Sequence, residues 1–303
     1  MKKTSVDLFG GFTLVIFSLM LGLNQVLIKI VNIGIQPVLQ AGLRSLIALI
    51  PILIFSFFYK RSLSITDGSL RSGILCGLIF SIEFIFLFKS LELTSVARAS
   101  ILFYSMPVWL CLAGHFLIPG ESLSLIKILG LLFAVLGIGA ALFLRDINVS
   151  GSFLGDYFAL IAGILWCSIV LIVRTTKLKN SSPEMQIVYQ LVVSTIVLIP
   201  TSFLFGDLIR DLSYEIIAIL IFQSVIIVAT GFLIWFWVLS IYPASTVASF
   251  GFLSPVFGWS SHAHAYASAA RRRVFATIGG PSFCIFASLQ RNRSALPCRA
   301  VPG

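Results

Sequence analysis

The sequence predicts an all-α polytopic membrane protein built from two inverted five-helix repeats, the second of them incomplete, with about nine recognisable spans. The first observation is composition: 58% of the 303 residues are hydrophobic, 11% are charged and the mean hydropathy is +1.06. So apolar a chain is typical of membrane proteins. The second is a series of apolar runs of about 20 residues, the length that crosses a bilayer. The third is that segments of the first half recur in the second.

Eight spans are clear, and a ninth begins but its apolar run is not completed. The predicted limits are 9–31, 37–59, 71–91, 95–117, 123–144, 154–174, 185–206 and 215–241, with the ninth opening at Pro243. The first run follows a basic start, as in a secretory signal, but it is too long and no small-residue cleavage site follows it. We therefore expect it to be retained as a membrane helix.

The distribution of Lys and Arg predicts a cytoplasmic N-terminus, because cytoplasmic loops carry the excess of positive charge. With this orientation the outer side holds Lys89, Arg98, Arg145 and Arg210, and the inner side holds Lys2, Lys3, Lys60, Arg61, Arg71, Lys127, Arg174, Lys177 and Lys179. The net charge of +10 therefore reflects topology and a basic tail. No nucleic-acid partner is expected, because the spans leave no soluble basic face.

The polar residues of the sequence form none of the common catalytic patterns. The sequence contains no Ser-His-Asp constellation, no phosphate-binding glycine loop and no HExxH, and its five cysteines have neither metal-ligand nor disulfide spacing. We therefore expect no enzymatic activity, no metal and no cofactor. An intramembrane enzyme or a non-transporting helical scaffold is the alternative, although neither needs two inverted halves.

Displacements of 145 to 149 residues align the two halves. The alignment pairs Lys29 with Arg174, Pro37 with Pro183, Gln40 with Gln186, Arg44 with Gln190, Pro51 with Pro200, and Pro107 with Pro255. Five spans are an odd number, so the second copy enters the membrane from the opposite side. Inverted repeats give one fold two related states, each open to one side, with a substrate site between the repeats. The expected mechanism is alternating access.

Several of these segments resemble a known family. They are LMLGLN at 19–24, GILWC at 163–167, the paired prolines Pro107 and Pro255, and a Gly120–Glu121 turn before a glycine-punctuated helix. At these positions the chain resembles the drug/metabolite transporter superfamily, in particular its EamA-like members, from about Phe9 to Trp259. The resemblance implies a ten-helix secondary transporter of the bacterial inner membrane that exports amino acids, other metabolites or drugs.

The chain departs from this pattern after Trp259. From Ser260 onward it has six Arg, no Lys and no acidic residue, and no apolar run of 20 residues follows. We interpret 1–147 as the first repeat, 148–259 as a truncated second repeat, and 260–303 as out-of-frame or otherwise foreign sequence. A genuine basic tail that binds anionic lipid is the alternative.

Candidate site residues are polar and lie within spans, because charged side chains are costly in lipid. The repeat partner of Glu83 is Gly231, so this carboxylate occurs in one half alone. Glu83 is expected either to act in a cavity, by coupling transport to protons or as the counter-charge to a cationic substrate, or to pair with Arg44 or Arg98. Arg44 is suited to a carboxylate or phosphate, or is the partner of Glu83. The remaining predicted cavity residues are Gln40, Asn24, Gln25, Tyr104, Trp166, Tyr189 and Gln190, and Pro107 and Pro255 are predicted to shape their helices.

Overall fold

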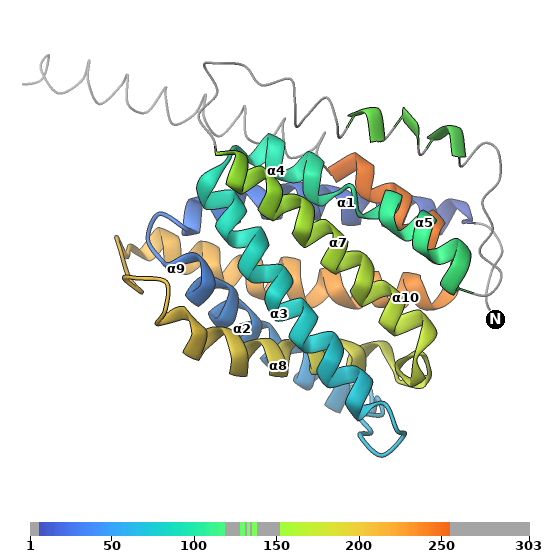
Figure 1. The fold of residues 1–303 in the computed structure, drawn as a ribbon. Helices are drawn as coiled ribbons and strands as arrows, with labels where there is room; N and C mark the ends of the chain where they lie inside the picture. Colours follow the sequence, from blue (N-terminus) through green and yellow to red (C-terminus); the bar gives the residue numbers. More distant parts are fainter. Residues whose placement is uncertain (1–5, 119–127, 131, 134, 138–151, 255–303) are drawn as a thin grey trace, which may run out of the picture. The chain divides into compact units, whose positions relative to one another are not determined.

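The computed structural model describes residues 6–118, 128–130, 132–133, 135–137 and 152–254 (Figure 1). This part of the chain is helical apart from turns and one isolated antiparallel bridge between Ile35 and Ile209. Seven helical segments in it are long and apolar enough to cross a membrane. The predicted all-α polytopic membrane fold is therefore confirmed.

The first four spans follow the predicted limits closely. They are α1 (Leu8–Val31), α2 (Pro37–Phe58), α3 (Leu70–Leu93), and the pair α4 (Val96–Phe103) and α5 (Met106–Leu117). Asp7 caps α1 through a hydrogen bond from the Gly10 amide, 2.9 Å long. The fourth span breaks just before Pro107, which has no amide hydrogen to donate. This break fits the helix-shaping role predicted for Pro107.

Three further spans belong to the second half. They are α7 (Phe153–Thr175), α8 (Pro183–Ser202) and a composite span, Tyr214–Ile241, made of α9 (Tyr214–Phe222), the π-helix η2 (Gln223–Thr230) and α10 (Gly231–Ile241). α8 ends four residues before the predicted limit of 206. The chain turns instead, with the Phe203 amide bonded to the Pro200 carbonyl (3.3 Å) and Gly206 at φ +93°.

Several predictions fall wholly or partly outside the described residues. Of the fifth predicted span, 123–144, the described part contributes to a short apolar helix, Ile128–Gly137. The ninth span begins as predicted with α11 (Ala244–Ser249) and the 3₁₀ turn η3 (Phe250–Leu253). The Gly120–Glu121 turn, Pro255 and the tail 260–303 lie outside this part of the chain.

Helices of the two halves pack directly on one another. α3 lies beside α7, as Figure 1 shows, and α2 packs along α8. Glycines permit close approach, as is common between membrane helices. A Cβ at Gly77 of α3 would lie 2.5 Å from the Val193 Cβ and 2.8 Å from the Tyr189 carbonyl oxygen of α8. This contact includes backbone, so a rotamer change cannot relieve it.

Gly77→Ala is therefore expected to destabilise the folded protein by about 1–3 kcal/mol, the usual cost of overpacking. Thermal unfolding of the detergent-solubilised protein, followed by fluorescence-detected size exclusion, measures the effect. Gly11→Ala is the matched control, because a Cβ there meets nothing within 4 Å. An unchanged melting temperature for Gly77→Ala would show that α3 and α8 are not this close.

The two ends of the helices are held by separate sets of polar contacts. At the end where α1 terminates, called the Lys29 end, Arg210 pairs with Glu92 (2.6 Å) and its amide bonds to the Gly34 carbonyl (2.9 Å). At the opposite end, called the Asp7 end, Ser181 donates to Asp67 (2.7 Å). Loops from the two halves thus meet at both ends.

Candidate functional site

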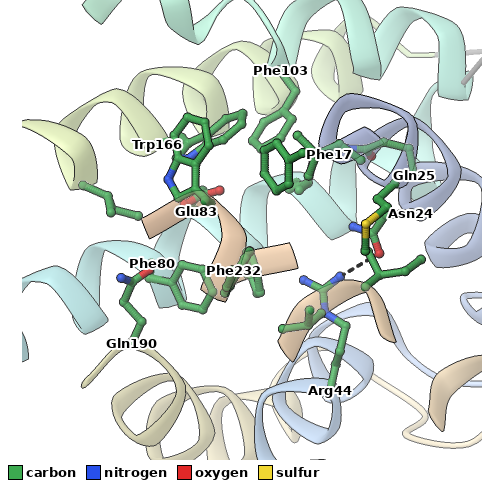
Figure 2. Close-up of a pocket in the computed structure, with 18 of the residues that line it drawn as sticks. Phe17, Asn24, Gln25, Arg44, Phe80, Glu83, Phe103, Trp166, Gln190 and Phe232 are labelled. Carbon is green, nitrogen blue, oxygen red and sulfur yellow. Dashed lines mark hydrogen bonds between the residues drawn. The ribbon is translucent and has the colours of Figure 1, made fainter. Parts of the chain in front are cut away.

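A pocket lies in the middle of the helices and is lined by both halves (Figure 2). The space between its lining atoms, open part included, is about 710 Å³. Its walls come from α1, α2, α3, α4, α7, α8, η2 and α10. The predicted cavity residues found in these walls are Asn24, Gln25, Arg44, Glu83, Tyr104, Trp166 and Gln190.

Two predicted cavity residues lie elsewhere. Tyr189 precedes Gln190 on α8 and therefore faces another direction, and its hydroxyl is 3.0 Å from the Ser69 hydroxyl. Gln40 lies one turn before Arg44 on α2 and is fully buried, and neither polar atom of its side chain has a hydrogen-bond partner. Gln40 thus leaves an unsatisfied amide beside the pocket rather than in its wall.

Arg44 makes one long hydrogen bond and two cation–π contacts, and part of its guanidinium has no hydrogen-bond partner. Its Nη1 donates to the Asn24 side-chain oxygen (3.3 Å). The guanidinium carbon lies 4.6 Å from the ring centre of Phe84 and 4.7 Å from that of Phe88, within cation–π range. Its Nε has no hydrogen-bond partner. This buried cation is therefore positioned but incompletely satisfied, as an anion receptor requires.

Glu83 is 3% exposed, and its Oε2 has no hydrogen-bond partner. The structure has no ion pair within 4.0 Å between Glu83 and Arg44, and the two side chains lie apart in Figure 2. Arg98 instead pairs with Asp156 (2.6 Å), so the predicted alternative of a Glu83–Arg98 pair is wrong. Burying an unpaired carboxylate is costly. A proton or a cationic ligand would remove that cost.

Aromatic side chains form the rest of the wall. Trp166 stacks on Phe103, with ring centres 5.0 Å apart, and packs beside Trp235 at 5.4 Å. Phe17 also stacks on Trp235, with ring centres 5.3 Å apart. The Tyr104 hydroxyl donates to the Leu21 carbonyl (2.9 Å). The pocket therefore joins a continuous aromatic surface to the buried charges.

Sequence reasoning named Tyr104 and Trp166 but missed the other aromatic residues of the wall, although the repeat alignment pairs several residues that line the pocket. The partners of Arg44, Trp166 and Asn24 are Gln190, Leu21 and Ile169, and all six residues line the pocket. At the displacement of 148, Phe84 pairs with Phe232, and Leu87 pairs with Trp235; these four also line it. The alignment thus pairs some pocket residues with each other, but Gly231, the partner of Glu83, does not line the pocket.

A multi-pass helical fold around a central amphipathic pocket is an architecture that membrane transporters have. The profile of the EamA-like transporter family matches residues 8–143 and 153–260, and the chain belongs to this family. The resemblance seen in the sequence is therefore confirmed.

Similar proteins agree with this assignment. The chain is 25% identical over 249 residues to the uncharacterized transporter YoaV of Bacillus subtilis (strain 168), covering 80% of this chain and 85% of that protein. It is 26% identical over 261 residues to an uncharacterized transporter of Archaeoglobus fulgidus, with coverages of 84% and 88%. A solved crystal structure has the same fold, with a TM-score of 0.63, 18% identity and coverages of 82% and 84%.

Proposed function

We propose that this membrane transporter is a secondary active exporter of small amphipathic metabolites, working by alternating access. The observation that carries the proposal is the pocket, which places Arg44 and Glu83 beside an aromatic wall. Arg44 would bind a carboxylate or phosphate of the substrate, and the aromatic side chains would cover its apolar body. Amino acids and drug-like acids belong to this class.

The pattern of helix contacts supports two inverted repeats. α3 of the first half packs along α7, and its counterpart is the contact of α1 with α9 and α10. The contact of α3 with α8 has its counterpart in that of α2 with η2 and α9, and α2 packs against its own counterpart, α8. Such reciprocity is what a pseudo-twofold relation between the halves would produce.

Glu83 is the residue to which we assign coupling. It is buried, it has an unpaired oxygen, and Gly231 stands at its repeat position. A carboxyl group that takes up a proton on one side of the membrane and releases it on the other couples transport to a proton gradient. We infer a cytoplasmic N-terminus from the Lys and Arg distribution, and a bacterial inner membrane from the family resemblance.

Transport by the full-length chain in proteoliposomes tests the proposal. The vesicles would be loaded with radiolabelled amino acids or drug-like acids, and a pH gradient would be imposed across the membrane. We expect substrate movement to accelerate with the gradient and to collapse when an uncoupler is added. The proposal would be contradicted if none of these compounds were transported, or if the rate of transport did not depend on the pH gradient.

A further inference from the structure

Two clusters of contacts at opposite ends of the membrane helices repeat one another. The Thr94 cluster consists of Lys29, Thr94, Arg98, Gly155 and Asp156, at the Lys29 end. The Tyr242 cluster consists of Asp7, Gly10, Arg174 and Tyr242, at the Asp7 end. At the displacement of 148, Thr94 and Tyr242 are repeat partners, each just before the fourth helix of its repeat.

The first shared contact joins the end of the first helix to the start of the fourth within each repeat. Lys29 Nζ donates to the Thr94 carbonyl (2.5 Å), and Arg174 Nη2 donates to the Tyr242 carbonyl (2.7 Å). Lys29 and Arg174 are repeat partners at the displacement of 145. The same cation-to-carbonyl bond therefore occurs in both halves.

The second shared contact joins the two repeats through a pair of glycines. A Cβ at Gly155 of α7 would lie 3.0 Å from the Thr94 Cβ, and a Cβ at Gly10 of α1 would lie 2.7 Å from Cζ of Tyr242. Gly10 and Gly155 are partners at the displacement of 145. Each first helix thus meets the residue that precedes the other repeat's fourth helix, through the Thr94 Cβ at Gly155 and through the ring of Tyr242 at Gly10.

The third shared contact is a hydroxyl-to-carboxylate hydrogen bond between the repeats. The Thr94 hydroxyl donates to Asp156 (2.8 Å), and the Tyr242 hydroxyl donates to Asp7 (2.5 Å). Asp7 caps α1, and Asp156 lies in the first turn of α7, one turn further along in the alignment. The carboxylates are therefore equivalent in role, although not in register.

The pocket lies between the two clusters. Gly10 and Lys29 are 19 positions apart on α1, or about 28 Å in an α-helix, and the pocket-lining residues Phe17, Asn24 and Gln25 lie between them. On α7, Trp166 and Ile169 likewise lie between Asp156 and Arg174. A contact between the repeats at each end can therefore close a path from the pocket to that side.

We propose that the Thr94 and Tyr242 clusters are the two gates of this transporter, and that opening one requires the other to stay closed. The inference rests on the proposed alternating access. Arg98 distinguishes the gates: it donates from Nε to Asp156 Oδ1 (3.2 Å) and from Nη2 to Asp156 Oδ2 (2.6 Å), whereas Thr246 occupies its repeat position. Arg98 therefore adds to closure at the Lys29 end.

Access to a cysteine in the pocket tests the gates without any substrate. Val228→Cys, at a pocket-lining position, would be introduced into the full-length chain after replacing Cys76, Cys111, Cys167, Cys284 and Cys298 by Ala. A membrane-impermeant maleimide is applied to one face of oriented vesicles at a time. Single cysteines at the exposed positions Thr66 and Asp207 identify the faces of the Asp7 end and the Lys29 end.

Thr94→Val and Tyr242→Phe are a matched pair, because each removes one hydroxyl from one gate and keeps its charges. Thr94→Val should raise labelling from the Lys29 end about fivefold relative to the other face, the effect of one hydrogen bond. Tyr242→Phe should raise labelling from the Asp7 end instead. The double variant Arg98→Gln with Asp156→Asn should act like Thr94→Val without leaving a buried charge unpaired.

The controls separate this inference from the proposed function. Lys89→Gln removes a cation that pairs with Glu92 at the Lys29 end but lies outside the gates. This variant should not alter the ratio of labelling between the two faces. If Thr94→Val and Tyr242→Phe both raised labelling from the same face, or if neither changed the ratio of labelling between the faces, the assignment of the gates would be wrong. The proposed transport function would still stand. A pocket reached from neither face in every variant would contradict alternating access itself.

Discussion

Glu83→Gln is expected to abolish transport driven by a proton gradient while leaving substrate exchange intact. The amide keeps the shape of the side chain and most of its hydrogen-bonding capacity, but it cannot take up and release a proton. Exchange of labelled for unlabelled substrate needs no net proton movement and should continue. Counterflow and gradient-driven uptake, measured on the same proteoliposomes, distinguish the two activities.

Glu215→Gln is the matched control, because it makes the same change at an exposed position at the start of α9. It should leave both activities unchanged. Gradient-driven transport by Glu83→Gln would eliminate proton coupling through this residue. If Glu83→Gln failed to fold and Arg44→Met restored folding, the carboxylate would instead be a structural partner of Arg44.

Arg44→Gln is expected to weaken binding of an anionic substrate by about 10- to 100-fold, which corresponds to losing a hydrogen bond to a charged group. Arg44→Lys should recover only part of the affinity, because an ammonium keeps the charge without the planar two-pronged geometry. The cation–π contacts of the guanidinium with the rings of Phe84 and Phe88 would also be lost. Competition against a labelled substrate gives the apparent affinity of each variant.

Arg71→Gln provides the comparison, since Arg71 is exposed at the start of α3 and lies outside the pocket walls. The ester or amide of a carboxylate substrate supplies a second comparison. A neutral analogue should bind the unaltered protein weakly and should be little affected by Arg44→Gln. Equal losses for acid and ester would indicate that Arg44 supports the helices rather than the substrate.

The helices were predictable because a helix needs an apolar run of sufficient length to cross a bilayer. α2 begins at Pro37, as expected, and ends at Phe58, one residue from the predicted limit. The end of α8 was missed because residues 203–205 are still apolar, whereas the turn depends on Gly206 adopting a left-handed conformation. Composition reports the cost of exposure to lipid but carries less information about local backbone geometry.

The pocket was predictable where a residue was polar and less so where it was aromatic. Asn24 and Gln25 stood out because an amide in an apolar span needs a polar environment. Phe17 and Phe80 line the same pocket, but Phe is equally stable facing lipid, so a span rich in Phe does not reveal which ring faces inward. Asp156 was missed as the partner of Arg98 because it lies near a helix end, where a carboxylate is unremarkable.

The π-helical turn η2 distinguishes the third span of the second half from its counterpart α3. The span Tyr214–Ile241 has 28 residues, whereas its counterpart α3 has 24. A π-helix bonds each amide one residue further back than an α-helix does, so it widens the helix locally. Phe232 and Trp235, which follow η2, still line the pocket together with their counterparts Phe84 and Leu87. The residues around the pocket thus keep their repeat pairing, although the helix geometry before them differs between the two halves.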